Sequence, residues 1–222
     1  MAEIVAAFGV THAVIMVRTW ERASQAHRDA VRAGYDEVAR RLRAARPDVV
    51  MLVASDHFQA FFLDNMPAFC LGVSGRSTGC GDGGLPRYEL AVHDRLARGL
   101  LEGLVEAGFD LAYARDLPLD HAFMTPVHMI FPQADLAVVP LFQNCNAPPL
   151  PSVGRCLQLG GAIRAVLERI EPGLRVALIG TGGLSHEVPL LDWRTLRDSP
   201  ADRDWLHFMS AGRQGADPAV QQ

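Results

Sequence analysis

The chain has 222 residues, a formal net charge of -4 and 49% hydrophobic residues, enough apolar material for the core of an α/β domain. No basic run or aromatic-studded basic stripe stands out, which argues against a nucleic-acid partner. No apolar segment reaches the roughly 18 to 20 residues of a membrane span, and the N-terminus lacks a basic region followed by a long apolar core. We therefore expect a cytoplasmic protein without a membrane partner.

The four cysteines are scattered along the chain and include no Cys-x-x-Cys pair: Cys70, Cys80, Cys145 and Cys156. This spacing argues against a zinc knuckle and against a redox dithiol. We expect all four to be reduced.

The first part of the chain alternates apolar runs with helical spacing. Residues 4–10 form a short apolar run with β-branched members, which predicts a strand that ends near His12. Helical spacing follows over 20–46, and a proline closes that helix. The nearly continuous apolar run 48–54 is typical of a strand buried on both faces of a parallel sheet. It ends just before His57.

The later part of the chain continues this alternation after a glycine-rich segment, 74–86, which is predicted to be a surface loop. The expected elements, in order, are a helix over 88–107, a weak strand over 109–114, a strand over 136–142, a helix over 152–170, a strand over 175–179 and a short helix over 204–211. The pattern predicts a single α/β domain over residues 1–222. Its mostly parallel central sheet is flanked by helices, with the active site at the strand ends.

Four of the eight histidines stand at comparable places. His12, His57 and His186 each follow a strand-like run within a few residues, and His121 lies in a predicted loop after one. The carboxyl ends of parallel strands meet at one edge of a sheet, so these side chains are expected to share a site. Neutral imidazole binds zinc, copper, iron or nickel, and histidine is also the usual general acid or base near neutral pH. The residues alone leave both uses open.

The glycine run at 180–183 has three interpretations. A phosphate cradle is disfavoured, because the dinucleotide fingerprint needs a glycine where Ser185 stands and the P-loop needs a Gly-Lys-Ser/Thr sequence. A hydrolase nucleophile elbow is disfavoured, because that motif needs a glycine where Glu187 stands. The third interpretation is a turn that lets the chain leave the sheet.

Four motifs occur in one order along the chain: Thr11-His12, Ser55-Asp56-His57-Phe58, Asp120-His121 with Thr125-Pro126, and Gly180-Thr181-Gly182-Gly183-Leu184-Ser185-His186. This set resembles the class III extradiol catechol dioxygenases, the superfamily of protocatechuate 4,5-dioxygenase β subunits and 2,3-dihydroxyphenylpropionate 1,2-dioxygenase. The resemblance extends to about Pro189. The sequence from Met66 to Val73 is more similar to the dihydroxyphenylpropionate branch.

The resemblance implies that His12 and His57 ligate Fe(II), that His186 takes a proton from the substrate and that His121 lies by the oxygen site as an acid or hydrogen-bond donor. It implies a catechol substrate, 2,3-dihydroxyphenylpropionate-like or protocatechuate-like, with O2, no organic cofactor and a homo-oligomeric assembly. Asp56 and Asp120 each adjoin a key histidine and are candidates to fix a ring tautomer through a hydrogen bond. No substrate-binding residue is assigned.

One departure from the family concerns the third ligand, a glutamate that family members supply from a helix well after the Gly-Gly-x-Ser-His motif. This chain contains no glutamate after Glu187. We therefore expect a C-terminally shortened form, either truncated or natural, that binds iron poorly by itself. A catalytically inactive relative that serves as a binding or regulatory subunit, and a zinc-dependent ring-opening enzyme on the same scaffold, are the alternatives.

Overall fold

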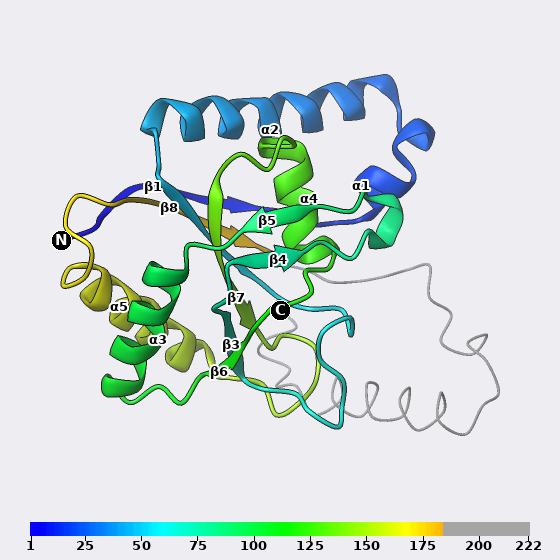
Figure 1. Ribbon diagram of the computed structural model, residues 1–222. Helices are drawn as coiled ribbons and strands as arrows, with labels where there is room; N and C mark the ends of the chain where they lie inside the picture. Colours follow the sequence, from blue (N-terminus) through cyan, green and yellow to red (C-terminus); the bar gives the residue numbers. More distant parts are fainter. Residues whose placement is uncertain (184–222) are drawn as a thin grey trace.

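A six-stranded sheet forms the centre of the protein in the computed structural model, which describes residues 1–183 (Figure 1). The strand order is β1 (Glu3–Val10), β8 (Arg175–Thr181), β2 (Val49–Ala54), β7 (Ala137–Gln143), β3 (Phe69–Gly72) and β6 (Ala112–Ala114). The first four strands are parallel, β3 is antiparallel to β7, and β6 is parallel to β3. The predicted α/β fold with a mostly parallel sheet is confirmed.

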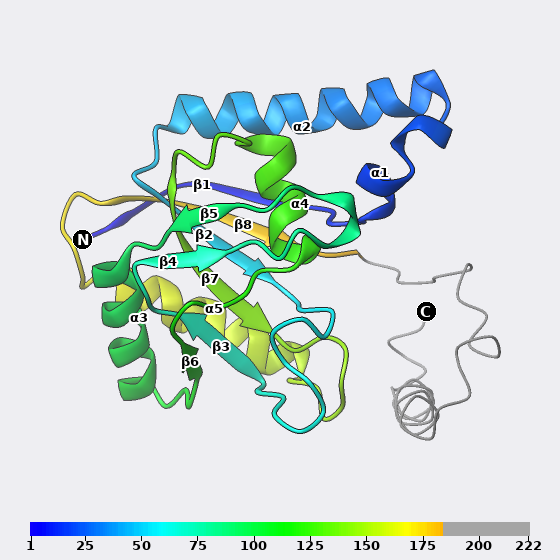
Figure 2. The same cartoon turned by 45° about the vertical axis from the view of Figure 1, so that its right-hand side comes forward.

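Helices pack in two pairs against this sheet, α2 beside α4 and α3 beside α5 (Figures 1 and 2). Their bounds, with those of the short helices that precede α2, are α1 (Ile15–Arg18), η1 (Trp20–Arg22), α2 (Gln25–Ala45), α3 (Asp94–Glu106), α4 (His121–Ile130) and α5 (Val153–Leu167). None of the helices described combines the length and apolar character that a membrane crossing requires.

Strand β2 is the centre of the core. Four consecutive residues, Val49 to Leu52, are fully buried, because β8 and β7 flank the strand and helices pack near its faces. The sequence prediction of a strand buried on both faces is correct here. Burial of each such side chain contributes about 1.5 to 3 kcal/mol relative to exposure.

Two predicted helices begin later than expected. The helix predicted over 20–46 starts at Gln25, because the Ser24 side chain accepts a hydrogen bond from the His27 N–H (3.3 Å) and caps the first turn. The helix predicted over 88–107 starts at Asp94. The residues before it form β5 (Glu89–Ala91), a strand rather than a helical turn.

The glycine-rich segment 74–86 is an ordered part of the fold, so the prediction of a surface loop is wrong in part. Strand β4 (Arg76–Thr78) pairs antiparallel with β5, and the turn η2 (Asp82–Gly84) follows. Gly83 has a φ of +64°, a left-handed value that favours glycine. A Cβ there would lie 1.9 Å from Cγ2 of Val14, so the turn packs closely on the segment that follows β1.

Helix α4 was not among the elements predicted from the sequence, and neither was strand β3. The helix begins at His121, in a segment expected to be a loop, and the Asp120 side chain caps it by accepting from the Ala122 N–H at 2.9 Å. Pro126 lies inside the helix. Proline has no N–H, so the Ala122 carbonyl lacks its usual helical donor. The short helix expected over 204–211 lies outside the described residues.

Candidate metal and acid–base site

Three of the four histidines singled out from the sequence come together at the carboxyl ends of the strands. The ring centroids of His12 and His57 are 5.2 Å apart and the rings are nearly perpendicular, at 85°. His121 stacks on His57 with centroids 4.1 Å apart and lies 6.1 Å from His12. His186, the fourth, lies outside the described residues, and its position stays a prediction.

The His57 ring is held by Asp120, which is fully buried. Its Oδ2 lies 2.7 Å from His57 Nδ1 and accepts the His57 backbone N–H at 2.8 Å, while Oδ1 accepts from Ala122. A carboxylate accepts the Nδ1 proton of a neutral imidazole, which makes Nε2 the unprotonated nitrogen of His57. Asp120 adjoins His121 in sequence, but the ring that it hydrogen-bonds is that of His57. The distance from Asp120 Oδ2 to His121 Nδ1 is 3.8 Å.

His12 is buried, and hydrogen bonds fix both its ring and the backbone just before it. Its Nδ1 lies 2.9 Å from the hydroxyl Oγ1 of Thr181, the last residue of β8. The residue before it, Thr11, accepts a hydrogen bond from the Tyr35 hydroxyl through its carbonyl (2.5 Å). Burial raises the pKa of Tyr35 to about 12, so this phenol stays a protonated donor near neutral pH. Helix α2 thereby fixes the backbone that carries His12.

His121 has its own carboxylate partner, Asp82, which the sequence analysis missed. The two lie in different elements, and Asp82 Oδ2 is 2.5 Å from His121 Nδ1. Burial lowers the pKa of His121, but the hydrogen bond to Asp82 and the nearby carboxylates outweigh it, so the net pKa is raised. Burial raises the pKa of Asp82, and the hydrogen bond to His121 outweighs it, so the net pKa is lowered. The sequence did contain one signal that could have pointed to Asp82: it is an acidic residue that stands between two glycines of a turn.

Asp56, also predicted to fix a histidine ring, is buried and holds the backbone after His57. Its carboxylate accepts the N–H groups of three successive residues, Gln59, Ala60 and Phe61, at 3.1 to 3.3 Å. These contacts fix the turn in which Phe58 adopts a φ of +60°. Burial, together with the charge of Asp120, raises the pKa of Asp56. Its predicted contact with a histidine ring stays a prediction.

The donor set of this site fits a divalent transition metal in part. His57 presents an unprotonated Nε2, and neutral imidazole is a common ligand of such ions. His57, Asp120 and His121 also offer ligand atoms within 4.8 Å of one another. Both Asp120 oxygens already accept hydrogen bonds, however, so this carboxylate is better suited to orienting His57 than to binding an ion.

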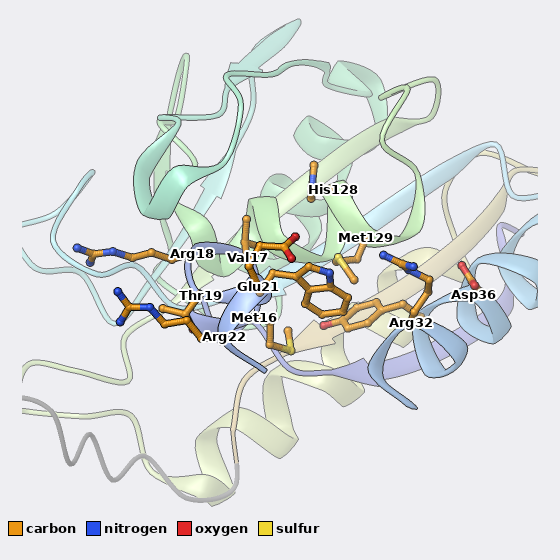
Figure 3. A pocket seen from close by; sticks show the side chains of 12 residues that line it. Met16, Val17, Arg18, Thr19, Glu21, Arg22, Arg32, Asp36, His128 and Met129 are labelled. Carbon is orange, nitrogen blue, oxygen red and sulfur yellow. The ribbon is translucent and has the colours of Figure 1, made fainter. Parts of the chain in front are cut away.

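A cavity of about 590 Å³ lies at the ends of β1, β8, β2 and β7, and none of the three clustered histidines lines it. Thr181, which contacts His12, lines it together with Val10, Ser55 and Cys145. A second cavity of about 570 Å³ lies among α1, η1, α2 and α4 (Figure 3). Its lining is rich in arginine and methionine, and among the residues described it contains His128 rather than the three clustered histidines.

The ion pair between Asp82 and His121 predicts a pH-dependent stability. The raised pKa of His121 contributes stability that is complete below its ordinary value of 6.5 and is lost as pH rises through the folded value. The lowered pKa of Asp82 contributes stability above 3.8 that is lost as pH falls through the folded value. Asp82→Asn should therefore destabilise the metal-free protein more at about pH 5.5 than at about pH 9.

Urea unfolding at the two pH values measures this difference. Asp110→Asn, at an exposed aspartate, is the matched control and should cost little at either pH. An equal loss of stability at both pH values in Asp82→Asn would show that the pair is not ionised as inferred.

The class of the protein follows from a family model described as the catalytic LigB subunit of aromatic ring-opening dioxygenase, which matches residues 6–209. The chain belongs to this family.

Among its curated relatives is a 2,3-dihydroxyphenylpropionate/2,3-dihydroxicinnamic acid 1,2-dioxygenase of Photorhabdus laumondii, 35% identical over 161 residues that cover 72% of this chain and 50% of the relative. Another, numbered 2, from Pseudomonas putida, is 38% identical over 188 residues, 80% of this chain and 57% of the relative. The chain thus spans about half the length of these relatives.

Among solved structures, the uncharacterized protein JW3007 of Escherichia coli K12 has a TM-score of 0.50 at 16% sequence identity, over 86% of this chain and 68% of that one. This likeness concerns the fold alone.

Proposed function

We propose that the protein is a non-haem Fe(II) extradiol dioxygenase that cleaves a catechol of the 2,3-dihydroxyphenylpropionate type. The observation that carries the proposal is the convergence of His12, His57 and His121 at one sheet edge, each with a hydrogen-bond partner at Nδ1. In a family of aromatic ring-opening dioxygenases, this arrangement favours two metal ligands and one proton-transfer group.

The residues divide between these tasks. His12 and His57 would hold Fe(II), which when bound would bring the catechol and O2 into contact and supply the redox chemistry. The pKa of His121 is raised, which favours its protonated form; in that form Nε2 would carry a proton that His121 can donate on the oxygen side. His186 is proposed as the base that accepts a proton from the catechol. Ring cleavage would fall beside the diol, giving a semialdehyde-type product.

The strand-end cavity is the proposed substrate site. It is partly apolar, and one of its lining residues, Thr181, contacts His12, which supports this placement of the aromatic ring of the substrate. The third ligand and the residue that recognises a substrate carboxylate stay unassigned. Assembly as a homo-oligomer stays a prediction.

Anaerobic reconstitution with Fe(II) tests the proposal. We expect bound iron and, after O2 is admitted, yellow ring-cleavage product from 2,3-dihydroxyphenylpropionate or protocatechuate. The control His57→Ala should lose the iron and form less than about 1% of the product, since one of two histidine ligands is gone. Activity restored by Zn(II) and not by Fe(II) would favour the zinc enzyme.

A catalytically inactive binding subunit is the second candidate, because the chain has no glutamate after Glu187 to complete the metal site of the family. Absence of iron and of product, with and without a C-terminal extension taken from a relative, would favour this candidate and contradict the first. Iron and product that appear only with the extension would show that the activity needs a longer chain.

A further inference from the structure

Thr181 occupies the glycine run whose sequence left three interpretations open. It closes β8 in register with Val10 of β1, two residues before His12. Its hydroxyl Oγ1 has two neighbours at hydrogen-bond distance, His12 Nδ1 at 2.9 Å and the Ala122 carbonyl oxygen at 2.9 Å. One side chain therefore connects the end of β8, the start of α4 and the first histidine.

The two contacts together fix where the protons lie. A carbonyl oxygen only accepts, whereas a hydroxyl carries a single proton and can also accept. Because Thr181 gives its proton to the Ala122 carbonyl, its oxygen can only accept from His12. In the neutral imidazole, the His12 proton is therefore on Nδ1, and Nε2 is the unprotonated nitrogen.

The alternative tautomer is disfavoured by Pro126. The Ala122 carbonyl lies in a fully buried residue and receives no helical N–H from position 126, since proline has none. If Thr181 turned its proton toward His12, this carbonyl would lose the hydroxyl donor. A buried acceptor that loses its partner costs about 1 to 3 kcal/mol, which favours the first arrangement.

We propose that Thr181 is a positioning residue that sets the tautomer of His12. The inference that this tautomer serves metal binding rests on the proposed function, whereas the assignment of the tautomer does not. A proton on Nε2 would remove the lone pair that an ion needs at that nitrogen. His57 and His121 are held at Nδ1 by carboxylates, whereas His12 is held by a neutral hydroxyl whose direction depends on a proline in another element.

Long-range ¹⁵N–¹H NMR of the imidazole rings in metal-free protein is the direct test, with the His12 signals identified by their loss in His12→Gln. We expect the Nδ1–H tautomer in the wild type and in Thr181→Ser, which keeps the hydroxyl. Thr181→Val keeps the shape and removes the hydroxyl, so the Nε2–H form should become populated. Tyr88→Phe is the matched control, because it removes a hydroxyl 2.7 Å from His128 Nδ1 and should leave His12 unchanged.

Anaerobic Fe(II) titration of the same variants gives the second readout. Thr181→Val should weaken affinity about 10- to 100-fold, as loss of a partner that orients a metal-binding histidine does, and Thr181→Ser should stay near wild type. An Nε2–H tautomer in the wild type, or an unchanged tautomer in Thr181→Val, would overturn the proposal. If the wild type binds no Fe(II) while the tautomer shifts as expected, the inference on Thr181 holds and the proposed function fails.

Discussion

Asp120→Ala is expected to lower the stability of the protein by about 3 kcal/mol and to weaken Fe(II) binding about 10- to 100-fold. The carboxylate is fully buried and accepts three hydrogen bonds, from the His57 backbone, the His57 ring and the first turn of α4. Its removal leaves buried donors without a partner and releases the His57 ring. Urea unfolding and anaerobic Fe(II) titration measure the two effects separately.

Asp120→Asn and Asp64→Ala sharpen this test. The asparagine can still cap α4 by accepting from Ala122 with its oxygen, but its NH2 group then faces the two N–H donors of His57. Asp120→Asn should therefore bind metal more weakly than the wild type, while it recovers part of the stability that Asp120→Ala loses. Asp64 is exposed, and its loss should change neither quantity by more than about 0.5 kcal/mol. Wild-type affinity in Asp120→Ala would show that the orientation of His57 does not control metal binding.

His121→Ala is expected to lower turnover about 100- to 10,000-fold while the iron stays bound. The reason is that His121 is proposed to transfer a proton, whereas His12 and His57 are proposed to hold the metal. His121→Phe is the closer variant, since a phenyl ring preserves the stacking on His57 and lacks the nitrogens. Product formation and iron content are measured on the same samples.

His57→Ala provides the contrasting result, loss of iron together with turnover. His186→Ala is expected to behave like His121→Ala, as the second proton-transfer residue. If either His121 variant loses its iron, the ligand and acid–base roles have been assigned wrongly.

The strands were largely predictable from the sequence because burial on both faces leaves a nearly continuous apolar run. The runs 48–54 and 136–142 correspond closely to β2 and β7, which pair with each other in the centre of the sheet. The placement of His12 and His57 follows directly, since each comes a few residues after a parallel strand. His121 was expected at the same site from a loop, whereas the structure brings it there as the first residue of α4.

The hydrogen-bond partners of the histidines were not predictable, because they depend on tertiary contacts. His57 bonds to a carboxylate 63 residues away, and His121 bonds to Asp82, 39 residues away in a segment whose glycines indicated a loop. Helix α4 was missed because Pro126 is a local signal against a helix. In the fold, the Thr181 hydroxyl replaces the donor that this proline lacks.

The position of β8 has a consequence for folding. This strand is the last one described in the chain, yet it lies between β1 and β2, the strands that precede His12 and His57. Among the described strands, β1 pairs with β8 alone, so this pairing waits until β8 has been synthesised and joins residues more than 160 positions apart. Such long-range pairing is slow and leaves an unpaired edge exposed meanwhile, so during translation the nascent chain depends on late closure of the sheet.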